Sequence, residues 1–155
     1  MKVWPGFHYL PGGEDDPAPA LPASVCLDLA TGKAFQSPEA LVRLYFKGRP
    51  SPAEIVAKAQ PFIAQDRRIV LGNEPNLPQE EFGGNANDYW DWFKECCQLA
   101  PDADFYSAAP SPGVPGWEKY YEHPGANFAY GRTVHAYGSL QQIKDICWLA
   151  LTSLP

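Results

Sequence analysis

The sequence contains no long hydrophobic run, no cluster of basic residues and no phosphate-binding glycine motif. No apolar stretch approaches the roughly 20 residues of a membrane span, and residues 1–6 lack the pattern of a signal peptide. With 12 basic and 18 acidic side chains, the formal net charge is −6, which makes nucleic acid and anionic membranes poor partners. Neither a Gly-x-Gly-x-x-Gly nor a P-loop motif occurs to support nucleotide binding.

Cysteine and histidine are too few and too scattered to predict a metal site. The four cysteines show no Cys-x-x-Cys and no Cys/His spacing, and the three histidines lie far apart in the chain. We therefore expect no metal or other cofactor. We interpret the cysteines as free buried thiols of a protein made in a reducing, intracellular compartment.

The composition is that of one globular domain. The chain has 155 residues, of which 45% are hydrophobic and 14% aromatic, enough to bury a sizeable core. No internal repeat or domain boundary is visible. Short apolar runs that end at Gly or Pro predict seven strands, at residues 3–10, 24–29, 41–46, 69–71, 103–109, 132–137 and 146–151.

Two helices are predicted between these strands. Ser51 and Glu54 form a capping box ahead of the first helix, although Pro61 is expected to kink or end it. The second helix, from about residue 85 or 87 to residue 99, has a buried stripe at helical spacing. That stripe consists of Tyr89, Trp92, Phe93 and Cys96. Shorter helices are predicted from residue 117 and over residues 139–145.

Strands that alternate with helices indicate βα units and a mostly parallel α/β sheet. Seven strands favour a shortened or incomplete (β/α)8 barrel, whose full form normally needs roughly 200 residues or more. A doubly wound open sheet is the competing architecture.

The stretch from residue 69 to residue 76 is the centre of the functional interpretation. A short buried strand ends at Asn73-Glu74, and Pro75 prevents its continuation. In α/β barrels, the carboxyl ends of the strands carry the chemistry, so Glu74 is a candidate catalytic carboxylate. The alternative is a simple polar turn.

Two motifs together resemble clan A glycoside hydrolases, which are (β/α)8 barrels that cleave glycosidic bonds with retention. They are residues 72–75, Gly-Asn-Glu-Pro, and residues 134–138, Val-His-Ala-Tyr-Gly. The resemblance implies that Glu74 is the general acid/base and that Asn73 contacts a sugar hydroxyl. It also implies that His135 and Tyr137 position the nucleophile and the sugar. The opening Gly-Phe-His-Tyr looks like the first strand of some members, which makes His8 a further sugar-binding candidate.

The chain departs from this family where the nucleophile is expected. Ser153 stands in the place of the second catalytic glutamate, no acidic residue follows Asp145, and no eighth strand is predicted. A Ser153–His135 pair is an alternative nucleophile, because a serine hydroxyl needs a base. Asp28, at the end of the second strand, is a candidate for the missing carboxylate. Alternatively, Asp28 is a buried acid that forms an ion pair with Arg43. Arg43 is itself a candidate for substrate binding.

Other residues near the expected rim have two interpretations each. Trp117, Tyr120 and Tyr121 follow the fifth strand, where they either stack on sugar rings or pack locally around a short helix. Glu80 and Glu81, in the loop after Glu74, are expected to be solvated.

Two functions remain open. The first is a small barrel-type glycoside hydrolase relative that acts on carbohydrate. The second is a catalytically inactive barrel descendant that binds glycan or builds an assembly. An incomplete barrel leaves strand edges exposed, and self-association or docking onto another subunit would cover them.

Overall fold

The computed structural model describes residues 7–9, 23–28, 42–46 and 48–133 of the chain. Within these residues, six strands form one sheet. The strands are β1 (Phe7–Tyr9), β2 (Ala23–Asp28), β3 (Val42–Tyr45), β4 (Ile69–Leu71), β5 (Phe105–Ser107) and β6 (Gly131–Arg132). The predicted strands over residues 3–10, 24–29, 41–46, 69–71 and 103–109 each overlap one of them, and the strand predicted over residues 132–137 overlaps β6 at Arg132. The predicted strand over residues 146–151 and the helix over residues 139–145 lie outside the described residues.

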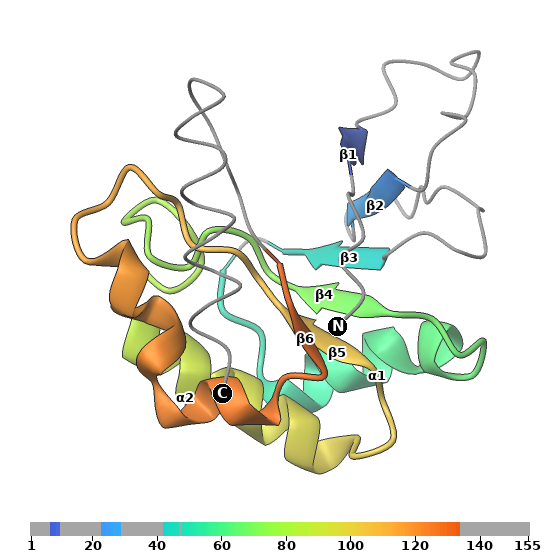
Figure 1. The fold of residues 1–155 in the computed structure, drawn as a ribbon. Helices are drawn as coiled ribbons and strands as arrows, with labels where there is room; N and C mark the ends of the chain where they lie inside the picture. Colours follow the sequence, from blue (N-terminus) through green and yellow to red (C-terminus); the bar gives the residue numbers. More distant parts are fainter. Residues whose placement is uncertain (1–6, 10–22, 29–41, 47, 134–155) are drawn as a thin grey trace.

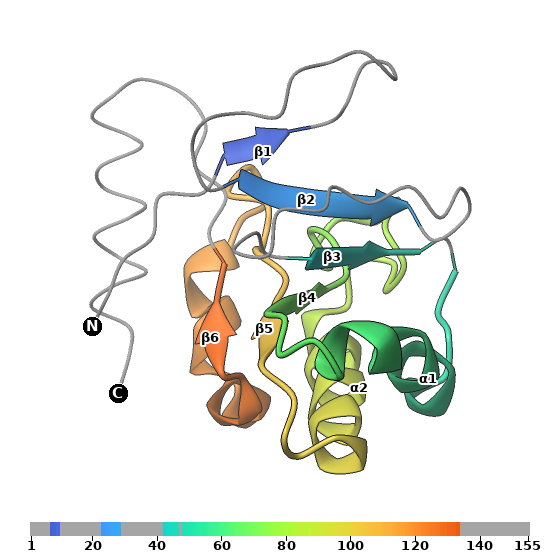
Figure 2. The same ribbon diagram turned by 90° about the vertical axis from the view of Figure 1, so that its right-hand side faces the viewer.

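Every neighbouring pair of strands is parallel, and the strands follow chain order from β1 to β6 (Figure 2). A doubly wound sheet reverses its strand order near the middle, and the described sheet has no such reversal. The predicted mixed α/β fold with a parallel sheet is therefore confirmed, and the doubly wound alternative is wrong for this part of the chain. Because all strands point the same way, the loops after β4 and β5 lie at one edge of the sheet (Figure 1).

The first helix, α1 (Pro52–Ile63), begins as its sequence predicts. The Ser51 hydroxyl accepts from the Glu54 N–H, and the Glu54 carboxylate accepts from the Ser51 N–H in return. The prediction that Pro61 disturbs the last turn is wrong, since the helix continues to Ile63. Pro61 lies on the exposed side of that last turn, where the missing N–H costs only one hydrogen bond.

The second helix, α2 (Ala86–Leu99), packs against α1 on the same side of the strands (Figure 1). The Asn85 side chain caps it by accepting from the N–H groups of Asn87 and Asp88. The predicted stripe is buried throughout. Cys96 and Cys97 are free thiols, as expected, and burial raises the pKa of the Cys97 thiol to about 12.

Two 3-10 segments, η1 (Trp117–Glu122) and η2 (Pro124–Phe128), cover the outer side of α2 and lead into β6. Tyr120 and Tyr121, both on η1, are buried against Trp90 of α2. For these two tyrosines the local-packing interpretation is confirmed, and their rings belong to the hydrophobic core.

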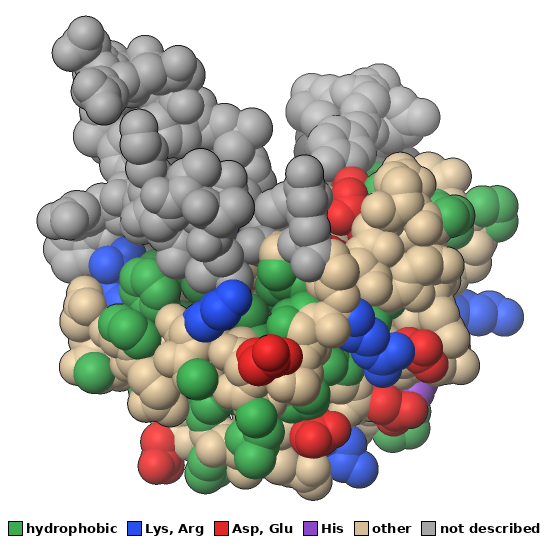
Figure 3. All heavy atoms as spheres, turned by 180° about the vertical axis from the view of Figure 1, so that it is seen from behind, with side chains coloured by type: hydrophobic (Ala, Val, Ile, Leu, Met, Phe, Trp, Pro, Cys, Tyr) green, Lys and Arg blue, Asp and Glu red, His purple; other side chains and the backbone are tan. Residues whose placement is uncertain are grey.

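No helix among the described residues is long and apolar enough to cross a membrane. On the face opposite to that of Figure 1, acidic and basic side chains of the described residues are interspersed (Figure 3).

Candidate functional site

Residues 72–76, here called the β4 turn, leave the carboxyl end of β4 in an unusual backbone conformation. Gly72 has φ +87° and its N–H donates to the Leu44 carbonyl of β3 at 3.0 Å. Glu74 has φ +32°, in the left-handed region that non-glycine residues rarely adopt. The Leu77 N–H closes the turn by donating to the Glu74 carbonyl at 2.9 Å. Such backbone strain costs of order 1–3 kcal/mol and occurs most often at functional sites.

Asn73 links the β4 turn to the neighbouring strand and to the loop that follows. Its side-chain oxygen accepts a 2.9 Å hydrogen bond from Nη1 of Arg43, which lies on β3 with only 4% of its surface exposed. Its side-chain nitrogen donates to Oε1 of Glu80 at 3.5 Å. The amide orientation of Asn73 is therefore set from both sides, as it must be for a group that orients a ligand.

Glu80 and Glu81 are each only partly exposed, whereas the sequence predicted fully solvated side chains. Burial raises the pKa of Glu80, the carboxylate of Glu74 raises it further, and the Asn73 hydrogen bond opposes both. Burial is also the main reason why the pKa of Glu81 rises to about 7; the charge of Glu80 adds to it and that of Arg43 opposes it. Backbone hydrogen bonds from Glu81 itself and from Phe46 also oppose this rise in pKa.

The charge of Glu74 is the smallest of the three influences on the pKa of Glu80, after burial and the Asn73 hydrogen bond. Glu80 was not predicted to be a second carboxylate from the sequence, where Asp28 was the candidate for that role. The available signal was its position six residues after Glu74 in the same loop, where consecutive turns fold the chain back on itself. Those turns are closed by backbone hydrogen bonds from Leu77 to Glu74 and from Glu80 to Leu77.

Asn76, the last residue of the β4 turn, is hydrogen-bonded to the loop after β5. The Asn76 side chain accepts from the Ser111 N–H at 2.7 Å and donates to the Ser111 carbonyl at 3.0 Å. Asn76 is 93% buried, so these hydrogen bonds are shielded from water. The β4 turn and the loop that leads to η1 are consequently held as one unit.

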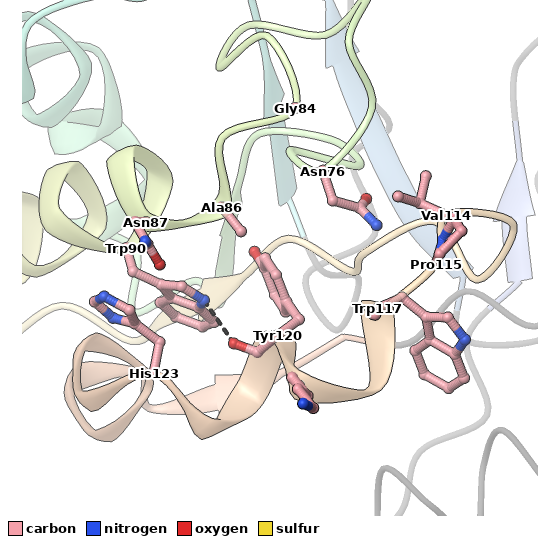
Figure 4. Close-up of a pocket in the computed structure, with 12 residues that line it drawn as sticks. Asn76, Gly84, Ala86, Asn87, Trp90, Val114, Pro115, Trp117, Tyr120 and His123 are labelled. Carbon is pink, nitrogen blue, oxygen red and sulfur yellow. Dashed lines mark hydrogen bonds between the residues drawn. The ribbon is translucent and has the colours of Figure 1, made fainter.

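A cavity of about 240 Å³ lies between that loop, η1 and the beginning of α2 (Figure 4). Tyr120 lines the cavity, with Trp90 and His123 to one side of it and Asn76 and Trp117 to the other (Figure 4). Trp117 is half-buried at the cavity and is the first residue of η1, where a short helix was predicted to begin.

The remaining predicted residues are placed less completely. His8 lies on β1, opposite Ser24 of β2, and Asp28 is the last residue of β2; the side chains of these two predicted residues are not described. His135, Tyr137 and Ser153 lie outside the described residues, so the structure does not place them relative to Glu74. In the part of the chain that the structure describes, no three His, Cys, Asp or Glu side chains are grouped to hold a metal ion.

Comparison of the chain with protein families, curated proteins and solved structures finds no match. Function is therefore argued from the residues of this chain and their geometry.

Proposed function

We propose that the chain acts on carbohydrate at the β4 turn, with Glu74 in the position of a general acid/base. The observation that carries this proposal is the arrangement of Asn73 and Glu74. Both follow the carboxyl end of a buried parallel strand, and Arg43 of the adjacent strand holds the Asn73 amide. This is the edge of a parallel sheet at which ligands bind, and the Asn-Glu-Pro motif there resembles that of clan A glycoside hydrolases.

We propose further that the described sheet belongs to a shortened (β/α)8-type barrel. Its strands are all parallel and in chain order, and α1 and α2 lie on one side of it. A barrel has this arrangement, because each right-handed βα unit places the next strand beside the last one. The β4 turn would then stand at the rim, beside the loops that follow β3 and β5.

Hydrolysis of a glycosidic bond needs a second carboxylate, about 5–5.5 Å from the first for retention or further away for inversion. Glu80 is the candidate for this second carboxylate, because it follows Glu74 by six residues in the same loop and accepts a 3.5 Å hydrogen bond from the Asn73 amide. In this proposal, Glu74 protonates the leaving oxygen and Glu80 is the partner carboxylate.

The test is hydrolysis of a panel of aryl glycosides and oligosaccharides by the unaltered chain, Glu74→Gln, Glu80→Gln and a control. Glu95→Gln is the matched control, because Glu95 is exposed on α2. General acid/base catalysis typically contributes about 10²–10⁴-fold, so each of the first two substitutions should lower kcat/KM by at least 10²-fold. The control should change nothing. Full turnover by Glu74→Gln would overturn the proposal. If only Glu80→Gln kept full turnover, Glu80 would not be the second carboxylate, and Asp28 would be the next candidate.

Carbohydrate binding without turnover is the second candidate function. Ser153 replaces the expected nucleophile, and the raised pKa of Glu80 disfavours the anion that a nucleophile or base requires. The chain would then bind glycan alone or as a subunit of a larger assembly. The same panel separates the two functions: oligosaccharides that bind with a measurable Kd but are never cleaved identify a binding protein.

A further inference from the structure

The cavity beside α2 is a separate space from the β4 turn but is joined to it through Asn76. Its volume of about 240 Å³ is below the roughly 300–1,000 Å³ of pockets that bury drug-sized ligands. It is therefore suited to one small ring. Asn76 ends the β4 turn and also lines the cavity, so the cavity lies directly beside that turn.

The walls of the cavity are fixed before any ligand arrives. Trp90 Nε1 donates to the Tyr120 carbonyl at 2.8 Å, a bond that is visible in Figure 4. The Tyr120 hydroxyl donates to the Ala108 carbonyl, and both of the Asn76 bonds to Ser111 hold the opposite wall. A preformed site loses little conformational entropy on binding, which favours affinity for a small ligand.

The chemistry of the cavity favours a ligand with a negative charge. Lys119 lies at its edge, and no acidic side chain that the structure describes lines it, although the chain as a whole carries a net charge of −6. His123 accepts from the Gly125 N–H through Nδ1, so in its neutral form Nε2 bears the proton and is a donor. The first residues of α2 also line the cavity and bring the positive end of the helix dipole to it.

The remaining lining suits a sugar ring. The half-buried indole of Trp117 offers an aromatic face at the edge, and the exposed Asn87 amide offers both a donor and an acceptor for hydroxyl groups. We propose that this cavity binds one sugar residue that carries a carboxylate, as a subsite next to the β4 turn. This inference rests on the proposed function, because it names the class of glycan that the β4 turn would act on or bind.

The test compares two matched probes, methyl β-glucuronide and methyl β-glucoside, which differ in a carboxylate at one carbon. Binding is followed by calorimetry and by the fluorescence of Trp90 and Trp117, both at the cavity. We expect the glucuronide to bind more tightly than the glucoside. Lys119→Gln should weaken glucuronide binding by about three- to tenfold, the range expected for an exposed charge-assisted contact. Lys58→Gln removes the same charge from the exposed face of α1 and should have no effect.

Three results would overturn the proposal: equal affinity for the two probes, equal loss of affinity in both lysine variants, or no saturable binding of either probe. The measurement is independent of catalysis. If hydrolysis depends on Glu74 but the glucuronide does not bind, the proposed subsite is wrong and the proposed function still stands. Glucuronide binding with no hydrolysis of any substrate supports the subsite and identifies a binding protein.

Discussion

The guanidinium of Arg43 donates a 2.9 Å hydrogen bond to the side-chain oxygen of Asn73 and so joins the interior of β3 to the turn after β4. A buried arginine is costly to desolvate, and its retention within the sheet is explained most simply by what it positions. Through Asn73 the same connection continues to Glu80. The orientation of the Glu80 carboxylate thus depends, through Asn73, on a residue of a different strand.

Replacement of Arg43 by Gln should destabilise the protein and impair its candidate site together. The variant loses a charge-assisted hydrogen bond and leaves buried polar groups without their partner, which costs about 2–3 kcal/mol of unfolding free energy. Arg49→Gln is the matched control. Arg49 pairs with Asp88 at 3.0 Å, but both side chains are 46% exposed, so the loss should stay below about 1 kcal/mol. Urea unfolding of both variants measures the difference, and equal losses would contradict the account.

Tyr89→Phe should loosen the junction between β4 and β5. The buried Tyr89 hydroxyl donates to the Leu71 carbonyl at 3.1 Å and accepts from the Ala108 N–H at 2.7 Å, at the ends of these two strands. Without it the Ala108 N–H is buried and unsatisfied, at a cost of about 1–3 kcal/mol. Tyr130→Phe, at a side chain that is 64% exposed, should leave the unfolding midpoint in urea unchanged. An equally stable Tyr89→Phe variant would show that this N–H finds another partner.

Glu81 should make the protein less stable as the pH rises. Its pKa is raised from 4.5 to about 7 in the folded state, so the folded state binds the proton more tightly than the unfolded state does. The stabilisation contributed by protonated Glu81 is therefore fully present below pH 4.5. It is lost as the pH rises from 4.5 to about 7. Because Glu81 is only partly buried, we expect a loss of about 1–2 kcal/mol.

Unfolding by urea between pH 5 and pH 8 measures this effect. Glu81→Gln keeps the shape of the side chain without the charge, so its unfolding free energy should vary less with pH and exceed that of the unaltered protein at pH 8. Glu95→Gln should keep the original pH dependence, since Glu95 is exposed. A pH dependence that persists in Glu81→Gln would assign it to another group.

The sequence predicted the elements of the fold where local signals were strong. The capping box of Ser51 and Glu54 marked the start of α1, because its hydrogen bonds form between residues close in sequence. The start of α2 was predicted only to within two residues, and the cap by Asn85 was seen in the structure alone. The helical period predicted the inner stripe of α2 but not the burial of Trp90. That burial depends on η1 and η2, which lie more than 20 residues away and cover the other side of the helix.

The candidate site was predicted only in part for the same reason. Asn73 and Glu74 could be found because a strand, a turn and a proline follow one another directly in the sequence. The partial burial of Glu80 and Glu81 was not predicted, since a polar loop with two adjacent acids is normally solvated. Their burial depends on how that loop folds back towards β3. The hydrophobic periodicity of the sequence does not predict the path of a loop.

The most direct test of the central claim is NMR of the ¹⁵N-labelled chain titrated with a panel of defined oligosaccharides, with Glu74→Gln used for any substrate that is cleaved. The account predicts saturable amide shifts at Asn73, Glu74 and Glu80, together with the Arg43 side chain, and unchanged signals from the exposed face of α1. Shifts that spare the β4 turn, or no saturable shift with any oligosaccharide, would contradict the claim that this turn is a carbohydrate site.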